Sequence, residues 1–439
     1  MMRKAALFTA FATVILLAAC SKDNKEDSGK MPWDDDLKPS VDPGKDDGEV
    51  KVGDTLPLWK EGFLDIHAVN TGRGECTFLV FPDGTSMCID AGEIGTKDPS
   101  SYKMVPQRPN SSTRAYITYG NYIKHFLPAS SKYVLDYFLL SHFHNDHYGT
   151  VTETAYDMDA KGGYRVVGMF GLYSVVKFNK LVDRIYPDYA EVDNSSNPSE
   201  AGSWKNGTSH YKKFVDYNTK SSGLKVEKFE LGSQSQFSLL KDPKTYSNFK
   251  VRNVCSNGCY WDGSKSVNTF GSAQLTENGA SNGVLISYGK FDYLSCGDAG
   301  QNGKVENPLA QSLDMRLEAM KAHHHMSSNT MTTSALQIYR PQVIVTQSFY
   351  ERPEDQPNAS VLSNVLGGAY VGTKNLYFTN AAGSAVVHPE LYGNEACKST
   401  GGHVVIRVAP GGDSFMVYVL DDTDTAFRIK RIDGPFTCN

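Results

Sequence analysis

The sequence predicts a layered α/β protein with β-sheets inside and helices outside. Short apolar runs bounded by turn residues, typical of strands, are followed by longer helical patterns, and the same order then repeats. Several of these runs end in ionisable residues, as strands do where open α/β folds build their sites. The clearest case is a mostly apolar run over residues 134–141, which three histidines and an aspartate follow directly.

The first twenty residues have the composition of an export signal. Arg3 and Lys4 form a short basic region, an apolar stretch follows, and "LAAC" ends at Cys20. The pattern resembles a bacterial lipoprotein signal peptide, and its apolar stretch is too short for a comfortable membrane span. The resemblance implies removal of residues 1–19, lipidation of Cys20, and an exported lipoprotein at the outer membrane or cell surface, with a periplasm-facing position as an alternative. An uncleaved N-terminal anchor is the competing interpretation.

Residues 20–55 have little apolar content and are rich in Asp, Lys, Gly and Pro. Such a segment buries too little surface to offset its ordering entropy, so we expect a flexible acidic tether. Its charged start also resembles the surface-export signal of Bacteroidetes lipoproteins. The chain has a formal net charge of −5, and the part after the tether is close to neutral. Charge therefore does not support a nucleic-acid partner, although one stays possible.

Residues 56–439 are long enough for one large domain, with an insertion around residues 151–250 where the pattern is least regular. The chain has eight cysteines, one of which is Cys20. Because an exported protein meets an oxidising compartment, we expect disulfides. The candidate pairs are Cys255 with Cys259, Cys397 with Cys438, and Cys76 with Cys88. The odd total in the exported part leaves at least one thiol free or bonded to another chain.

Strands dominate the first part of this domain. Apolar runs separated by turn residues predict strands over residues 63–69, 76–81, 86–90 and 134–141. Residues 113–127 are predicted to form a helix that ends before Pro128. Within the insertion, residues 164–176 and 225–231 look like strands, whereas the polar residues 193–210 look like a loop.

The second part repeats the order of strands, helix and strands. Residues 282–298 predict two strands around a "YGKF" turn, with Asp298 at the end. Residues 307–326 are predicted to be one helix running toward three consecutive histidines. Residues 341–348 predict another buried strand, and the tail after residue 401 predicts antiparallel strands.

The segment "HFHNDH" places ligand-type residues densely at the end of a predicted strand. It has the form H-x-H-x-D-H, at His142, His144, Asp146 and His147. Because side chains alternate along an extended chain, His142 and His144 point to one side and can reach one metal ion. Asp146 and His147 follow at the turn into the next element, where they can serve a second ion nearby. This density is hard to explain as packing.

Together with the upstream "CIDAG", this motif resembles the metallo-β-lactamase superfamily. The blocks "LDIHAVNTGRGECTFLVFPDGTSMCIDAG", "LLSHFHNDHYG", "NGVLISYGKFDYLSCGDAG" and "HHHMSS" also resemble, in that order, the extracytoplasmic hydrolase domain of ComEC-type competence proteins. The resemblance extends from Leu64 to about Ser348. It implies a four-layer αββα sandwich of the metallo-β-lactamase type.

The resemblance also implies a role for each matching residue. His142 and His144 would bind the first metal ion, and Asp146 and His147 the second. Asp298 would bridge both ions, and His324 or His325 would complete the second site. The expected catalytic carboxylates are Asp146 and Asp90, with Asp90 bracing the site from behind its ligands.

Three features depart from the family pattern. Met326 replaces the glycine of the family's "HHG" segment, so the inward-pointing histidine of the triplet His323 to His325 is left open. Between the H-x-H-x-D-H block and Asp298 the only histidine is His210, in a polar segment, so the first site lacks an evident third ligand. Glu75 replaces the aspartate of the family's glycine-rich turn.

Some of these histidines have a structural alternative. The triplet would also suit a helix C-terminus, where cationic side chains interact favourably with the helix dipole. His67, His388 and His403 are more often structural than functional in such positions.

The residues and the resemblance together predict a metal-dependent hydrolase. Two divalent cations on mixed imidazole and carboxylate ligands would activate water, with Zn²⁺ as the best fit and Mn²⁺ or Fe²⁺ as alternatives. The ComEC-type resemblance favours a phosphodiester in a small molecule or a polymer. The alternatives are an ester, lactone or β-lactam hydrolase, and a non-catalytic surface binding protein with a vestigial site.

Overall fold

The computed structural model describes residues 50–95, 104–190, 198–271, 275–349 and 356–439, with the side chains of residues 198–207 left out. The predicted signal peptide, Cys20 and most of the predicted tether lie outside the described residues. Within the described ranges, no helix is long and apolar enough to cross a membrane.

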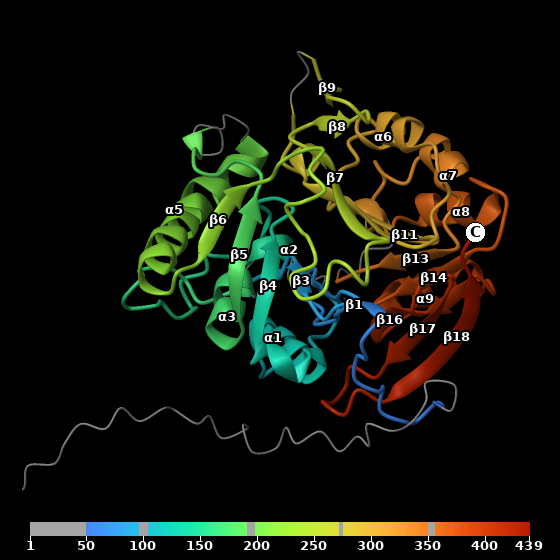
Figure 1. Ribbon diagram of the computed structural model, residues 1–439, viewed down its shortest axis with the longest axis horizontal. Helices are drawn as coiled ribbons and strands as arrows, with labels where there is room; N and C mark the ends of the chain where they lie inside the picture. The colour runs from blue at the N-terminus through green and yellow to red at the C-terminus, as the bar shows by residue number, and fades with distance from the viewer. Residues whose placement is uncertain (1–49, 96–103, 191–197, 272–274, 350–355) are drawn as a thin grey trace, which may run out of the picture. The chain divides into compact units, whose positions relative to one another are not determined.

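The strands form two mixed sheets of nine strands each (Figure 1). In spatial order the first sheet contains β18 (Ile429–Thr437), β17 (Ser414–Leu420), β16 (His403–Val408), β1 (Leu64–Ala68), β2 (Thr77–Val80), β3 (Ser86–Ile89), β4 (Val134–Leu139), β5 (Lys177–Asp183) and β6 (Lys225–Lys228). The second contains β15 (Cys397–Ser399), β14 (Asn375–Phe378), β13 (Val343–Thr346), β12 (Ala319–Lys321), β11 (Phe291–Ser295), β10 (Gly283–Tyr288), β7 (Phe249–Ser256), β8 (Cys259–Trp261) and β9 (Ser266–Asn268).

The two sheets pack face to face through one apolar core. Ile66 and Leu79 of the first sheet share this core with Val251 and Ile286 of the second. Neighbouring positions along a strand point to opposite faces, so Phe78, beside Leu79, belongs instead to the core on the outer face of the first sheet. Both faces of each sheet are therefore buried, which explains the nearly continuous apolar runs in the sequence.

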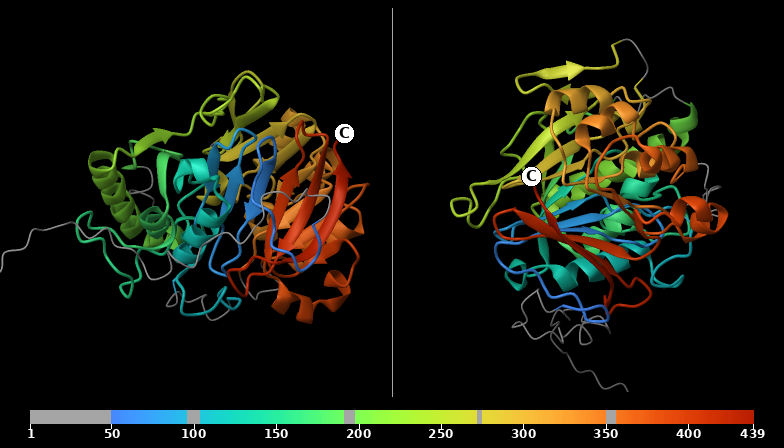
Figure 2. Two further views of the ribbon diagram at one scale, coloured as in Figure 1. Left: turned by 60° about the horizontal axis from the view of Figure 1, so that its bottom comes forward. Right: turned by 90° about the vertical axis from the view of Figure 1, so that its right-hand side faces the viewer.

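Helices cover the outer faces of both sheets (Figure 2). The core outside the first sheet includes side chains of α1 (Ala115–Phe126), α3 (Gly168–Val175) and α5 (Pro198–Ser221). The core outside the second sheet includes side chains of α6 (Glu306–Leu313), α7 (Thr333–Tyr339), α8 (Ala359–Gly367) and α10 (Pro389–Tyr392), and α9 (Ala382–Val387) packs against it. The short helices are α2 (Asn145–Tyr148), η3 (Ala129–Ser131), η4 (Asn278–Ala280) and η5 (His323–Met326). The architecture is the predicted four-layer αββα sandwich of the metallo-β-lactamase type.

Two predictions within residues 151–250 were wrong. Residues 168–175, predicted as strand, form α3, because a short apolar run suits a mostly buried helix as well as a strand. Residues 198–210, predicted as loop, begin the 24-residue helix α5. Its buried residues Tyr211, Phe214, Val215 and Asn218 recur at helical spacing beyond the polar part.

The single helix predicted over residues 307–326 is also wrong. Helix α6 ends at Leu313, where Asp314 adopts a left-handed conformation, and residues 319–321 form β12 in the middle of the second sheet. The residues of this segment favour helix individually, but pairing with β11 and β13 decides their conformation. The histidine triplet therefore follows a strand, and its interpretation as a helix cap is wrong.

The structure gives the seven described cysteines as free thiols. Of the predicted pairs, Cys76, directly before β2, and Cys88, on β3, lie together, with their Sγ atoms 3.7 Å apart. Cys255 instead faces Cys296, because Gly283 on the intervening strand has no side chain and leaves room for both sulfur atoms.

Three histidines in the layer between the first sheet and α1 predict acid sensitivity: His67 and His403 are fully buried, and His125 is partly buried on α1. Burial lowers the pKa of His403 to about 3 and of His125 to about 4, and lowers the pKa of His67 as well. The unfolded chain takes up these protons near pH 6.5, whereas the folded protein excludes them. The contribution of these histidines to the free energy of unfolding is therefore fully present above pH 6.5. It falls as pH drops from 6.5 toward 4, by about 1.4 kcal/mol per pH unit for each excluded proton.

Urea unfolding between pH 7.5 and 5 measures this loss. His125→Gln removes one of the excluded protons. The slope of the free energy of unfolding against pH is therefore expected to fall by up to about 1.4 kcal/mol per pH unit. The control His388→Gln changes a partly exposed histidine that pairs with Glu390, and should leave the slope unchanged. Equal slopes for all three proteins would contradict the prediction.

Candidate metal centre

The candidate site lies where parallel strands of both sheets end. Asp90 directly follows β3, and the segment carrying His142 to His147 follows β4, which pairs parallel with β3. Asp298 follows β11, and the histidine triplet follows β12, which pairs parallel with β11. The carboxyl ends of parallel strands meet at the same edge, so the fold brings together residues far apart in sequence.

Four predicted ligands form one compact group. Ligand atoms of Asp146, His147, Asp298 and His325 all lie within 4.8 Å of one another. His325 Nε2 is 3.1 Å from Asp146 Oδ2, and His147 Nε2 is 3.2 Å from Asp298 Oδ2. All but Asp146 are fully buried, and Asp146 is mostly so. We call this group the second metal site.

His142 and His144 lie beside this group. His142 Nε2 is 3.1 Å from His144 Nδ1 and 3.8 Å from Asp298 Oδ2. Asp298 thus faces a residue from each half of the H-x-H-x-D-H motif, His142 and His147, as the prediction of a bridging aspartate requires. We call His142, His144 and Asp298 the first metal site. The structure places these residues together, and their binding of metal stays a prediction.

The triplet divides into three environments. Its backbone is left-handed at His324, His325 and Met326, with φ of 45°, 52° and 62°, so the methionine adopts a conformation that glycine takes at lower cost. His325 points into the second metal site. His323 turns away and its Nδ1 lies 3.0 Å from Glu306 Oε1. His324 lies at the edge, 24% exposed, with Nε2 3.7 Å from Asp298 Oδ2.

Asp90 acts through the histidines and does not join the compact ligand group. Its Oδ2 accepts from His147 Nδ1 at 2.8 Å and from Ser141 Oγ at 2.6 Å. Ser141 Oγ in turn lies 3.0 Å from His142 Nδ1. These bonds occupy the Nδ1 side of both rings, so that each Nε2 faces Asp298. Asp90 also has a positive φ of 60°, a backbone conformation that a non-glycine residue keeps only where the surrounding contacts enforce it.

Sequence reasoning missed Lys321 and gave Glu75 only as a departure from the family. Lys321 is 2% exposed, and its Nζ lies 2.9 Å from Glu75 Oε1 and 3.6 Å from Asp298 Oδ1. The same Glu75 oxygen lies 2.8 Å from His325 Nδ1, which also faces the carbonyl oxygen of Gln347 at 2.9 Å. A lysine at the end of a buried strand is the signal that could have identified this cation.

The charges of the site suit added cations. The carboxylates of Glu75, Asp90, Asp146 and Asp298 are buried together, and among the described residues Lys321 is the fixed cation in contact with them. Burial alone would lower the pKa of His147 and His325, but the neighbouring carboxylates outweigh burial and raise it well above the usual range. Both rings would then carry protons that a metal ion must displace, so metal binding should weaken as pH falls.

The donor set also fits divalent cations. Imidazole nitrogens and carboxylate oxygens are ligands of Zn²⁺, Mn²⁺ and Fe²⁺. Three imidazole Nε2 atoms face Asp298 Oδ2, whereas its buried Oδ1 accepts no hydrogen bond in the described structure and lies 3.6 Å from Lys321 Nζ.

Three chain segments, which contain Glu75, Gly92 and Asp146, approach one another closely and fix the position of Asp146. Gly92 N donates to Glu75 O, and Glu75 N donates to Asp146 O, each at 2.8 Å. A Cβ on Gly92 would lie 1.7 Å from Asp146 O, so no side chain fits between them. This glycine therefore sets how closely the Asp90 segment approaches the histidine motif.

Gly92→Ala is expected to displace the Asp146 segment and to destabilise the protein by about 1–3 kcal/mol. The second metal site should lose affinity, measured by metal titration and by urea unfolding. Gly367→Ala is the control, because nothing lies within 4 Å of a Cβ at Gly367. Wild-type metal affinity in Gly92→Ala would show that this contact does not position the site.

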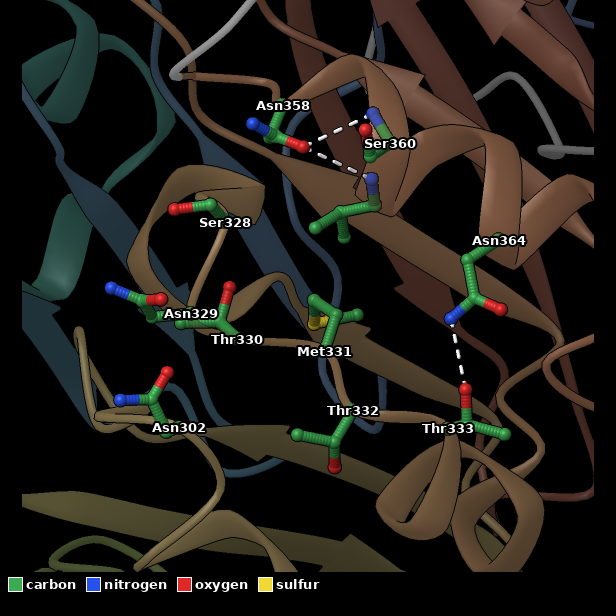
Figure 3. Close-up of a pocket in the computed structure, with 11 residues that line it drawn as sticks. Asn302, Ser328, Asn329, Thr330, Met331, Thr332, Thr333, Asn358, Ser360 and Asn364 are labelled. Carbon is green, nitrogen blue, oxygen red and sulfur yellow. Dashed lines mark hydrogen bonds between the residues drawn. The ribbon is translucent and has the colours of Figure 1, made fainter.

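A surface hollow of about 560 Å³ is lined by Asn302, residues 328–333, Asn358 and part of α8 (Figure 3). Asn302 lies four residues after Asp298, and the lining residues 328–333 begin three residues after His325. The rest of the lining comes from Asn358 and the first part of α8. Most lining residues are Asn, Ser or Thr, and none is charged.

The other histidines lie away from the site. His210 Nδ1 accepts from the backbone of Arg165 at 3.2 Å, so it belongs to the α5 region and is not the missing third ligand. His67 and His403 lie in the layer between the first sheet and α1, in contact with Tyr122.

The fold and the site together define a class: a four-layer αββα sandwich with a candidate centre for two metal ions. No family model matches the chain, and no curated protein matches it. Among solved structures it is similar to CmlA, a diiron β-hydroxylase from Streptomyces venezuelae, at 10% identity and a TM-score of 0.35 over 70% of this chain and 47% of that chain. It is also similar to a diphosphatase of the PhnP family, at 11% identity and a TM-score of 0.31 over 79% of this chain and 96% of that chain. Similarities this weak do not determine function, which depends on the residues of the site.

Proposed function

We propose that the protein is a metal-dependent hydrolase that holds two divalent cations and cleaves phosphodiester bonds. The observation that carries the proposal is the convergence of imidazoles on one carboxylate oxygen. The Nε2 atoms of His142, His147 and His325 lie 3.8, 3.2 and 3.4 Å from Asp298 Oδ2. Each of these rings has an oxygen atom behind it at Nδ1, so each can present an unprotonated Nε2 to the centre.

Two bound cations would lower the pKa of a water molecule and polarise a phosphoryl or carbonyl oxygen of the substrate. The ligand chemistry favours Zn²⁺, with Mn²⁺ or Fe²⁺ as alternatives. His142 and His144 would hold the first ion, and Asp146, His147 and His325 the second, with Asp298 between them. No protein nucleophile is required.

Hydrogen bonds from neighbouring residues orient the histidine ligands. Asp90 holds the tautomer of His147, and Glu75 with Gln347 holds that of His325. His324 is 24% exposed at the edge of the site, beside Asp298, and its Nε2 accepts from Asn278 Nδ2, so it borders the space in which a substrate would lie.

The small net charge favours a substrate other than nucleic acid. We further propose that the protein is exported and held by a lipid on Cys20, so that the substrate is met in the cell envelope. Mass spectrometry of the native N-terminus tests this anchor, and an unmodified Cys20 in a longer chain would contradict it.

Elemental analysis and hydrolysis assays on one preparation test the activity. We expect close to two ions per chain, and turnover of bis(p-nitrophenyl) phosphate well above that of nitrocefin or a lactone. Turnover of nitrocefin or the lactone alone would favour the alternative ester, lactone or β-lactam hydrolase. An intact protein with two ions and no turnover on any of them would favour a binding protein.

A further inference from the structure

A buried ion pair outside the predicted motifs reaches the loop of the first metal site. Arg184 directly follows β5, and Glu277 directly precedes η4. Arg184 Nε and Nη2 donate to the two oxygens of Glu277 at 2.9 and 2.6 Å. The side chains are 2% and 1% exposed, and Arg184 is among the largest fully buried side chains.

The same carboxylate holds the backbone between two predicted metal ligands. Glu277 Oε1 accepts from the backbone N–H of Phe143 at 2.8 Å, and Phe143 separates His142 from His144. The guanidinium carbon of Arg184 lies 5.7 Å from the centre of the Phe143 ring. The next residue, Asn278, places its Nδ2 3.3 Å from His324 Nε2. The pair thus connects β5 to the histidine motif and to the triplet.

Glu277 accepts three hydrogen bonds, from Arg184 Nε, Arg184 Nη2 and Phe143 N, and it belongs to neither group of candidate metal ligands in the described residues. A buried ion pair is also a poor source of stability, because the desolvation of both charges offsets much of their attraction. An apolar pair of similar size would stabilise the fold as well. What the ion pair adds is a fixed hydrogen-bond acceptor under the His142 to His144 loop.

We propose that Arg184 and Glu277 are positioning residues for the first metal site. The inference rests on the proposed binding of two ions. The first site has two histidines from one loop and Asp298 from the other sheet, and His210 does not complete it. With so few ligands, its affinity depends on where the loop holds His142 and His144, and Glu277 holds that loop at Phe143.

The test replaces both members of the pair, so that no buried charge is left alone. Arg184→Met with Glu277→Met removes the acceptor under Phe143 while keeping the volume nearly constant. The chain offers a matched control: Asp65 and Arg407 form a buried bidentate pair at 2.8 and 2.7 Å on β1 and β16. Asp65→Leu with Arg407→Met removes that pair in the same way.

Stepwise Zn²⁺ titration against a chromophoric chelator is the first readout. We expect the Arg184/Glu277 double variant to bind one ion as the wild type does and the other about 10–100-fold more weakly. Its titration should resemble that of His142→Ala and not that of His325→Ala. Glu277→Gln should recover part of the affinity, because its amide oxygen can accept from Phe143. The Asp65/Arg407 control should bind both ions as the wild type does.

Hydrogen–deuterium exchange of the metal-free protein is the second readout, and it does not depend on metal binding. Peptides covering residues 142–147 should exchange faster in the Arg184/Glu277 variant and at the wild-type rate in the control. Unchanged exchange there would overturn the inference, as would two wild-type affinities. If the wild type binds no ions but the variant still exchanges faster, the proposed function fails while the loop restraint stands.

Discussion

Asp298→Ala is expected to abolish the binding of both ions and to lower kcat/KM by at least about 10³-fold, equivalent to about 4 kcal/mol. Asp298 is the one described carboxylate that faces both metal sites, with Oδ2 3.2 Å from His147 Nε2 and 3.8 Å from His142 Nε2. Its burial raises its pKa, but the surrounding histidines outweigh this and hold the pKa well below the usual range. The low pKa favours the charged form of this carboxylate, which is the form that binds cations.

Elemental analysis of the purified variant measures the loss. His142→Ala should lose the first ion and keep the second, so the two variants differ in stoichiometry. The control is Asp292→Ala, which removes a partly buried carboxylate from β11 that bonds to Ser287 away from the site. Two ions bound to Asp298→Ala would refute the bridging role and with it the shared centre.

Lys321→Met should destabilise the metal-free protein by about 3–5 kcal/mol, because it leaves buried carboxylates without their cation. Glu75 and Asp298 lie 2.9 and 3.6 Å from Lys321 Nζ, and all three side chains are almost fully buried. The Coulomb attraction of Glu75 and Asp298 outweighs desolvation and raises the pKa of Lys321, so the lysine stays charged. The metal-loaded protein should lose less stability, since the ions supply the missing positive charge.

Urea unfolding with and without Zn²⁺ gives both values. Lys180→Met is the control, because its ion pair with Glu227 at 3.0 Å is partly exposed and should contribute less than about 1 kcal/mol. A loss for Lys321→Met that is equal in the two states would mean that the lysine and the ions do not share the same carboxylates.

The H-x-H-x-D-H segment and the hairpin ending at Asp298 could be recognised from sequence because each is a local pattern. A strand that ends in ligand-type residues shows its period and its end within a few residues. The predictions for α3 and β12 were wrong because the residue types in these segments are compatible with two conformations. Helix α3 is a short apolar segment, and strand β12 is a short segment of residues that favour helix, so only their neighbours in space decide between helix and strand.

The residues that support the site were harder to predict than its ligands. Lys321 and Glu277 belong to no spacing pattern, and each becomes informative only through a partner far away in the chain. Glu277 holds Phe143 across 134 sequence positions, and Glu75 meets Lys321 from the opposite sheet. Such contacts depend on the packing of the two sheets, which a single sequence does not display.

The sequence by itself determined the layered α/β class, the chemistry of the candidate ligands and the order in which they occur, because these follow from local periodicity and residue type. Only the tertiary structure decided which histidine of the triplet faces the centre, which cation balances its carboxylates and which ion pair holds its loop. These features lie where the two sheets meet at one edge. The direction of the side chains there is set by long-range packing and by a strained turn at His324 and His325.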